Sequence, residues 1–222
     1  MIVAQRKPLS EIITKIEPYK KIIIAGCDTC VAECHAGGKK EVELLAAQLR
    51  IAFNQKMIPV EISECSIERQ CEPEMIEPCA ECVMKHDAVL SIACGIGVQQ
   101  MAERFPDIPV LPGLNTTFMG THAAPTEWAE RCAGCGNCVL DLTAGICPIA
   151  RCSKSLLNGP CGGARDGKCE VSDDIPCAWV EIVERMTKNG KLKQLKQIIP
   201  PKEWNTARDG GTRRLIHEEA AP

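Results

Sequence analysis

Residues 21–38, KIIIAGCDTCVAECHAGG, decide the fold of the first part of this chain. Their first seven residues form a short apolar run rich in β-branched side chains, which predicts a buried strand. A Gly-Gly pair at the end of the stretch precedes a helical pattern. Ligands collect at the carboxyl ends of strands in open α/β sheets. Three cysteines stand at this position: Cys27, Cys30 and Cys34.

Strand and helix patterns alternate along the next eighty residues. The alternation predicts a parallel sheet with crossover helices, a small Rossmann-like domain over residues 1–125. Pro59 places one of its strands at an edge or weakens it. The predicted strands are 21–27, 57–62, 87–94 and 108–111, and the predicted helices are 40–53, 78–86 and 98–104.

The pattern changes near residue 125, where apolar periodicity stops and Cys, Gly and Pro dominate. Such a stretch has too few apolar side chains to order itself, and bound metal would supply the missing free energy. A helix follows, with Ser172, Asp173 and Asp174 as capping candidates, and Gly190 is a stop signal. The predicted fold class is α/β: a Rossmann-like parallel sheet domain, then a cysteine-rich, metal-cluster-stabilised domain (126–200) with a C-terminal helix, then a polar tail (201–222).

Composition excludes several classes of protein. The chain has 222 residues, a formal net charge of −3 and 3% aromatic residues, which argues against binding to nucleic acid. No run of eighteen apolar residues exists, so no membrane insertion is expected. The N-terminus is too polar for a secretory signal, so we expect a cytoplasmic protein.

Sixteen cysteines suggest either disulfides or metal binding. A disulfide scaffold is typical of small secreted proteins. This chain shows no export signal, is long enough to bury a core without cross-links, and clusters its cysteines at metal-ligand spacings. We therefore expect reduced thiols that bind metal or clusters. Their number also fits an anaerobic organism, because oxidation threatens such sites.

The central cysteine group begins with the spacing C-x2-C-x2-C, which is typical of iron–sulfur ligation. Eight thiols make two four-thiolate sites, and the sequence does not determine their pairing. Structural zinc, which also uses four thiolates, is the alternative. The group comprises Cys132, Cys135, Cys138, Cys147, Cys152, Cys161, Cys169 and Cys177.

A second site is predicted at the N-terminal end of the chain. Cys94 ends the third predicted strand, and parallel strands would bring it to the same sheet edge as Cys27. It would complete a site with Cys27, Cys30 and Cys34. The alternative is that Cys94 is a small buried apolar residue. The remaining cysteines are interpreted as free thiols or alternate ligands, with a fourth metal site as the other possibility: Cys65, Cys71, Cys79 and Cys82.

Residues 132–179 resemble the cysteine-rich C-terminal domain of methylenetetrahydrofolate reductases, in the phrases GICPIARCSKSLLNGPCGG and GKCEV. The segments IAGCDTCVAECHAGGKKEVELLAAQLR and ACGIGVQ are similar to the small subunit of the heteromeric reductase of acetogenic bacteria. The resemblance covers roughly residues 20–198 and leaves the group from Cys65 to Cys82 unmatched.

This resemblance implies a non-catalytic, electron-transfer subunit of an oxidoreductase complex. It implies two or three [4Fe-4S] clusters, with zinc in one four-thiolate site as an option. It implies a heterodimer with a TIM-barrel partner that holds FMN and reduces methylenetetrahydrofolate to methyltetrahydrofolate in the Wood–Ljungdahl pathway. Ferredoxin or another electron-donating subunit would supply the electrons. The alternative is a zinc-binding structural scaffold subunit of the same complex.

Overall fold

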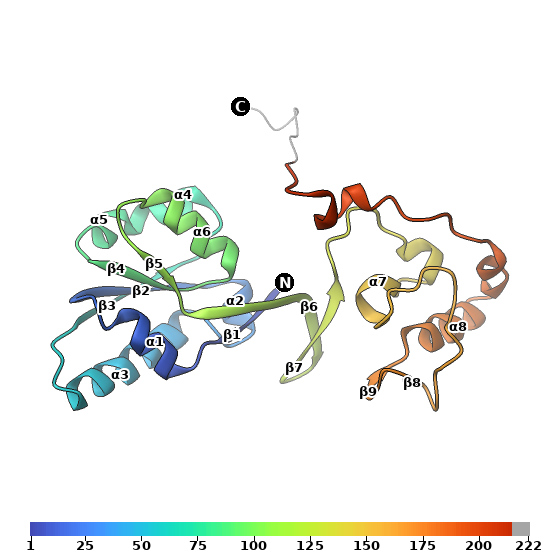
Figure 1. Ribbon diagram of the computed structural model, residues 1–222, viewed down its shortest axis with the longest axis horizontal. Helices are drawn as coiled ribbons and strands as arrows, with labels where there is room; N and C mark the ends of the chain where they lie inside the picture. The colour runs from blue at the N-terminus through green and yellow to red at the C-terminus, as the bar shows by residue number, and fades with distance from the viewer. Residues whose placement is uncertain (215–222) are drawn as a thin grey trace. The chain divides into compact units, whose positions relative to one another are not determined.

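A computed structural model describes residues 1–214 of the chain (Figure 1). The chain divides into two compact units. The first unit is Met1–Trp128, and the second begins at Ala129. We describe each unit by itself.

The first unit is built on a four-stranded sheet with the order β3-β2-β4-β5. The central strand β2 pairs in parallel with both β3 and β4, and β4 pairs in parallel with β5. The predicted parallel α/β sheet is therefore confirmed. The strands are β2 (Lys21–Cys27), β3 (Glu61–Ile67), β4 (Ala88–Ile92) and β5 (Val110–Pro112).

Helices cover both faces of this sheet (Figure 1). Successive side chains of a strand point to opposite faces. Ile22 and Ile24 therefore belong to one core cluster, while Ile23 and Ala25 belong to the other. The helices α1 (Leu9–Ile16) and α3 (Lys39–Gln55) pack on the first face, and α4 (Pro73–Ile76), α5 (Ala80–Val83) and α6 (Gly95–Arg104) pack on the second.

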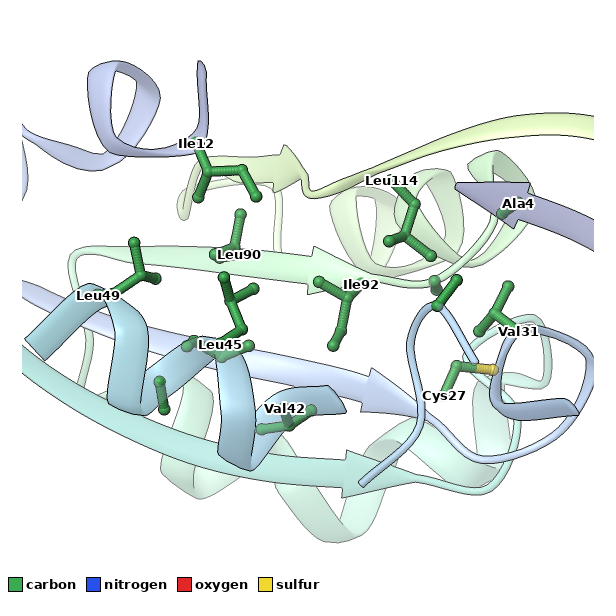
Figure 2. Close-up of a cluster of buried hydrophobic side chains, with 14 of the residues drawn as sticks. Ala4, Ile12, Cys27, Val31, Val42, Leu45, Leu49, Leu90, Ile92 and Leu114 are labelled. Carbon is green, nitrogen blue, oxygen red and sulfur yellow. The ribbon is translucent and has the colours of Figure 1, made fainter. Parts of the chain in front are cut away.

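The larger core lies between α3 and the sheet. Val42, Leu45 and Leu49 repeat at helical spacing along α3. Leu45 and Leu49 point toward β4, where Leu90 and Ile92 lie (Figure 2), and Val42 packs against Gly26 of β2. The five apolar side chains are buried. The helix predicted at 40–53 is therefore present, because apolar residues at three- and four-residue intervals share one helix face.

A second sheet in this part of the chain was not predicted. β1 (Ile2–Arg6) pairs antiparallel with β6 (Leu114–Ala124), and β7 (Glu127–Cys132) follows as the third strand. β6 carries mostly exposed, polar side chains, so its sequence has little apolar alternation to reveal a strand. The short helix α2 (Cys30–Glu33) lies between β2 and α3.

The second unit has little regular structure and a small core. Its elements are α7 (Pro148–Arg151), the antiparallel pair β8 (Lys168–Cys169) and β9 (Ser172–Pro176), and α8 (Ala178–Lys188), with short 3-10 turns between and after them. The core centres on Trp179, Ile182 and Met186 of α8, with Ile146 against them. The predicted C-terminal helix is therefore present.

Two predicted elements of the first unit differ from the structure. The strand predicted at 57–62 begins only at Glu61, because Pro59 has no amide hydrogen to donate to a neighbouring strand. In place of the helix predicted at 78–86, the structure has a 3-10 turn at Glu77–Cys79 followed by the four-residue helix α5, and α4 precedes both. Pro78 lies inside this turn, where it removes an amide donor that a continuous helix needs.

One prediction for the second unit also needs correction. Ser172, Asp173 and Asp174 lie in β9, and the residue that precedes the first turn of α8 is Cys177. The described part of the polar tail contacts the cysteine-rich segment: Thr206 donates to the Cys135 carbonyl at 3.0 Å and Arg213 to the Gly134 carbonyl at 2.7 Å. Residues 215–222 of the predicted tail lie outside the described residues.

Across residues 1–214, none of the helices combines the length and the apolar character needed to cross a membrane.

Substitution of Leu45 by Ala is expected to lower the free energy of unfolding by about 2–5 kcal/mol, because it leaves a cavity between α3 and the sheet. Leu44 is the matched control, since its side chain is 54% exposed while that of Leu45 is fully buried. Leu44→Ala should change the free energy by no more than about 0.5 kcal/mol. Urea unfolding followed by far-ultraviolet circular dichroism measures both, and equal midpoints would contradict the described packing.

Candidate metal centres

The first candidate centre lies at the carboxyl edge of the parallel sheet. β2 ends at Cys27, and Cys94 follows β4 as the residue before the first turn of α6. Because β2 and β4 are adjacent and parallel, Cys27 and Cys94 are at the same edge, as the sequence analysis expected. Their ligation of a metal stays a prediction.

The loop after β2 folds back over this edge. The Cys27 amide donates to the Gly37 carbonyl at 2.9 Å, which closes the loop that carries Cys30 and Cys34. Gly37 packs so closely on β4 that an added Cβ would overlap the Ile92 carbonyl oxygen. Glycine at this position therefore allows the cysteine loop to approach the end of β4.

Asp28 and Glu41 fix the two ends of the same loop. Asp28 accepts a hydrogen bond from the Lys39 amide at 2.8 Å and another from the Ser66 hydroxyl of β3 at 2.5 Å. Glu41 accepts one from the Gly38 amide at 3.0 Å, in the manner of a capping box. These contacts hold the loop between β3 and the start of α3.

The cysteines of this loop differ in their surroundings. Cys30 is partly exposed at the beginning of α2. Cys34 is buried, and its sulfur lies 3.6 Å from the Ala4 carbonyl oxygen and 3.5 Å from that of Val31. Burial raises the pKa of the Cys34 thiol. Hydrogen bonds from the backbone of Ala4 and Ala36 act in the opposite direction and lower this pKa.

Cys71 also reaches this edge, although the sequence analysis did not assign it to the site. It lies in the loop after β3, the other neighbour of β2. Partial desolvation raises the pKa of the Cys71 thiol, and the nearby Cys27, Glu72 and Cys94 add to the shift. The signal available in the sequence was its distance of four residues from the end of a parallel strand, but that strand was predicted at the wrong position.

The second candidate centre is a cavity in the second unit. It has a volume of about 110 Å³ and is lined by apolar residues that include Leu156, Ala164 and Trp179. Four of the predicted ligands line the same cavity: Cys152, Cys161, Cys169 and Cys177.

Polar groups lie close to two of these sulfurs. The pKa of Cys169 is lowered, first by a hydrogen bond from the Val171 backbone and then by Ser153, whose hydroxyl oxygen lies 3.6 Å from the sulfur. The Gly163 amide donates to the Cys161 sulfur at 3.4 Å, and a Glu170 carboxylate oxygen lies 3.7 Å from the same sulfur. A thiolate is the form that binds metal, so the lowered pKa of Cys169 suits a ligand.

The other four predicted ligands of the second unit do not line this cavity. Backbone amides again donate to sulfur, from Gly134 to Cys132 and from Ala150 to Cys147, both at 3.4 Å. The Cys135 sulfur lies 3.7 Å from the Asn137 carbonyl oxygen, and Cys138 is exposed. The four predicted ligands that do not line the cavity are Cys132, Cys135, Cys138 and Cys147.

The predicted ligands are not gathered tightly. Within residues 1–214, no three histidine, cysteine, aspartate or glutamate side chains are close enough together to bind one metal ion. All sixteen cysteines are free thiols, so none is joined in a disulfide. The structure places Cys27 and Cys94 at one sheet edge and four later cysteines around one cavity.

Three further cysteines of the first unit form a separate group on the opposite face of the sheet. Cys65 and Cys79 pack against the core cluster under α5 and α6, and Cys82 is exposed. The pKa of Cys65 is raised, first by burial and then by the adjacent Cys79 thiol. Cys71 is not part of this group, because the thiols that add to its raised pKa are those of Cys27 and Cys94.

Comparison with known families gives one match. Residues 111–205 match the family described as methylene-tetrahydrofolate reductase C terminal. This part of the chain is related to methylenetetrahydrofolate reductases. No curated protein and no solved structure matches the chain.

Cys65 is expected to react slowly with iodoacetamide in the folded protein, because its raised pKa keeps the thiol protonated and only the thiolate is nucleophilic. Cys82, which is exposed, should be modified much faster at pH 8. Residue-specific mass spectrometry over time measures both rates. The two residues should become equally reactive in guanidinium chloride. Equal rates in the folded protein would show that Cys65 is not held in a buried site.

Proposed function

We propose that this chain is an iron–sulfur electron-transfer subunit of a methylenetetrahydrofolate reductase complex. The family match over residues 111–205 supports the relation to this enzyme. The electron-transfer role is supported by the arrangement of cysteines in both units. The chain itself would be non-catalytic, and its electrons would pass to the FMN of a catalytic partner subunit that reduces methylenetetrahydrofolate.

The observation that carries the proposal is the four-cysteine cavity of the second unit. A volume of about 110 Å³ is several times the roughly 30 Å³ that a water molecule occupies in the liquid. The cavity is therefore large enough for a group of several atoms. Its four thiols match the four thiolate ligands of a [4Fe-4S] cluster.

The cavity between the thiols is the reason to prefer a cluster over zinc at this site. Zinc binds thiolate sulfur at about 2.3 Å, so the sulfurs of one zinc site lie roughly 4 Å from each other around a single ion. The sulfurs that hold a [4Fe-4S] cluster surround a group of several atoms, in agreement with a cavity lined by four cysteines.

The chain's own contribution is to position the sulfurs and to adjust their charge. Bound clusters would accept and release single electrons. Backbone amides of Gly134, Ala150 and Gly163 donate hydrogen bonds to cysteine sulfurs. Hydrogen bonds to sulfur and the degree of solvent exposure set the reduction potential of such sites. Cys132, Cys138 and Cys161 are exposed, so their sites would be accessible to an electron donor or acceptor.

The proposed electron route needs two partners. A ferredoxin or another electron-donating subunit would reduce a cluster in this chain, and the FMN of the catalytic subunit would accept the electrons. We place the protein in the cytoplasm of an anaerobe, because exposed thiolate sites need a reducing, oxygen-poor environment. The Wood–Ljungdahl pathway follows from the resemblance to the reductase of acetogenic bacteria.

The pairing of the eight cysteines in the second unit can be tested with two single substitutions and their combination. Cys161→Ala should remove about four irons and four labile sulfides per chain, and Cys135→Ala should remove the same amount. Because the two residues serve different sites, the double variant should lose about eight irons. Iron and sulfide analysis of anaerobically purified full-length protein measures the losses.

Cys82→Ala is the matched control, since Cys82 is exposed and lies far from the proposed ligands in the sequence. It should retain all of the iron. A double variant that loses only about four irons would show that Cys135 and Cys161 share one cluster. Wild-type protein with zinc and no labile sulfide would contradict electron transfer and favour the structural scaffold.

A further inference from the structure

A buried glutamine ties together the three strand ends at the first candidate centre. Gln70 lies in the loop after β3, and its side chain is fully buried. It donates to the carbonyl oxygens of Ala25 and Gly26 in β2, at 2.9 and 2.8 Å. It also accepts a hydrogen bond from the Ser91 hydroxyl of β4 at 2.7 Å. A buried amide with all these partners fixes the loop tightly, because breaking them would leave polar groups unpaired.

The same loop packs against the helix that begins after Cys94. Gly97 is the third residue of α6, and an added Cβ there would lie 2.8 Å from the Gln70 Cβ. Glycine therefore permits close approach of the loop to the first turn of α6. From the other side, the Cys27 sulfur lies 3.8 Å from the Glu68 carbonyl oxygen of this loop.

These contacts determine the place of Cys71, the residue after Gln70. Gln70 is hydrogen-bonded to both β2 and β4. The loop that carries Gln70 and Cys71 contacts Cys27 through Glu68 and contacts α6 at Gly97. The Cys71 side chain is exposed, so it is available to a ligand at the sheet edge. Cys71 is thus next in sequence to a side chain that bridges β2, which ends at Cys27, and β4, which Cys94 follows.

The sulfur of Cys34, by contrast, faces away from this loop. Cys27 and Cys34 are both buried in the core cluster on the α1–α3 side of the sheet. The Cys27 sulfur lies near the Glu68 carbonyl oxygen of the loop that carries Cys71, whereas the Cys34 sulfur lies near the carbonyl oxygens of Ala4 in β1 and Val31 in α2. Cys34 therefore contacts β1 and α2 rather than the loop after β3.

We propose that Cys71 is a ligand of the first metal centre, together with Cys27, Cys30 and Cys94, and that Cys34 has a structural role. The four sulfurs would then come from the loops after three neighbouring parallel strands, β3, β2 and β4. The ligand class is a thiolate-bound iron–sulfur cluster. This inference rests on the proposed function, and it replaces one member of the ligand set expected from the sequence.

Three variants of the full-length, anaerobically purified protein test this assignment. Cys71→Ala should lose about four irons and four labile sulfides per chain, together with one of the electron spin resonance signals of the reduced protein. Cys34→Ala should retain all of the iron and lower only the unfolding midpoint. Cys82→Ala, the matched exposed cysteine of the same unit, should resemble the wild type.

Alkylation of the wild-type protein provides a second test that does not depend on folding of a variant. Cys71 should be protected from iodoacetamide while iron is bound and become reactive after the iron is removed by a chelator. Equal reactivity of Cys71 in both states would overturn the assignment, as would Cys71→Ala with a full iron content or Cys34→Ala with the loss expected for Cys71→Ala. Wild-type protein without iron and sulfide would instead contradict the proposed function itself.

Discussion

The second unit has a small apolar core, and we propose that sulfur ligands supply the rest of its stability. From Ala129 onward, the buried apolar side chains gather around α8, and the segments on either side of α7 have short turns in place of long helices or strands. Four cysteines from four different segments line one cavity beside Trp179. Metal–thiolate bonds would join these segments directly, which is how small metal-folded domains obtain their stability.

The first unit has a larger apolar core than the second. Its parallel sheet has an apolar cluster on each face, so the sheet provides a rigid edge where three loops meet. Gly37, Gly97 and the buried side chain of Gln70 bring these loops within hydrogen-bonding distance of one another. Sulfur ligands on this edge would need little further ordering, because the sheet already determines their positions.

The sequence was sufficient for the parallel sheet, since β2 and β4 are continuous apolar runs and α3 has a clear apolar stripe. It was insufficient for β1, which is only five residues long, for β6, whose side chains are mostly exposed, and for the beginning of β3 beyond Pro59. Cysteine spacing predicted which residues are candidate ligands but gave neither the pairing of the eight later thiols nor the position of Cys71. Both depend on which loops meet in space, and Gln70 carries no local signal for that.

The most direct test of this account is X-ray absorption at the iron and zinc edges of the full-length protein, prepared without oxygen. The account predicts iron with sulfur neighbours and, beyond them, a second shell of iron atoms, as in [4Fe-4S] clusters. A zinc signal with four sulfur neighbours at every site, and no iron in the protein, would contradict it.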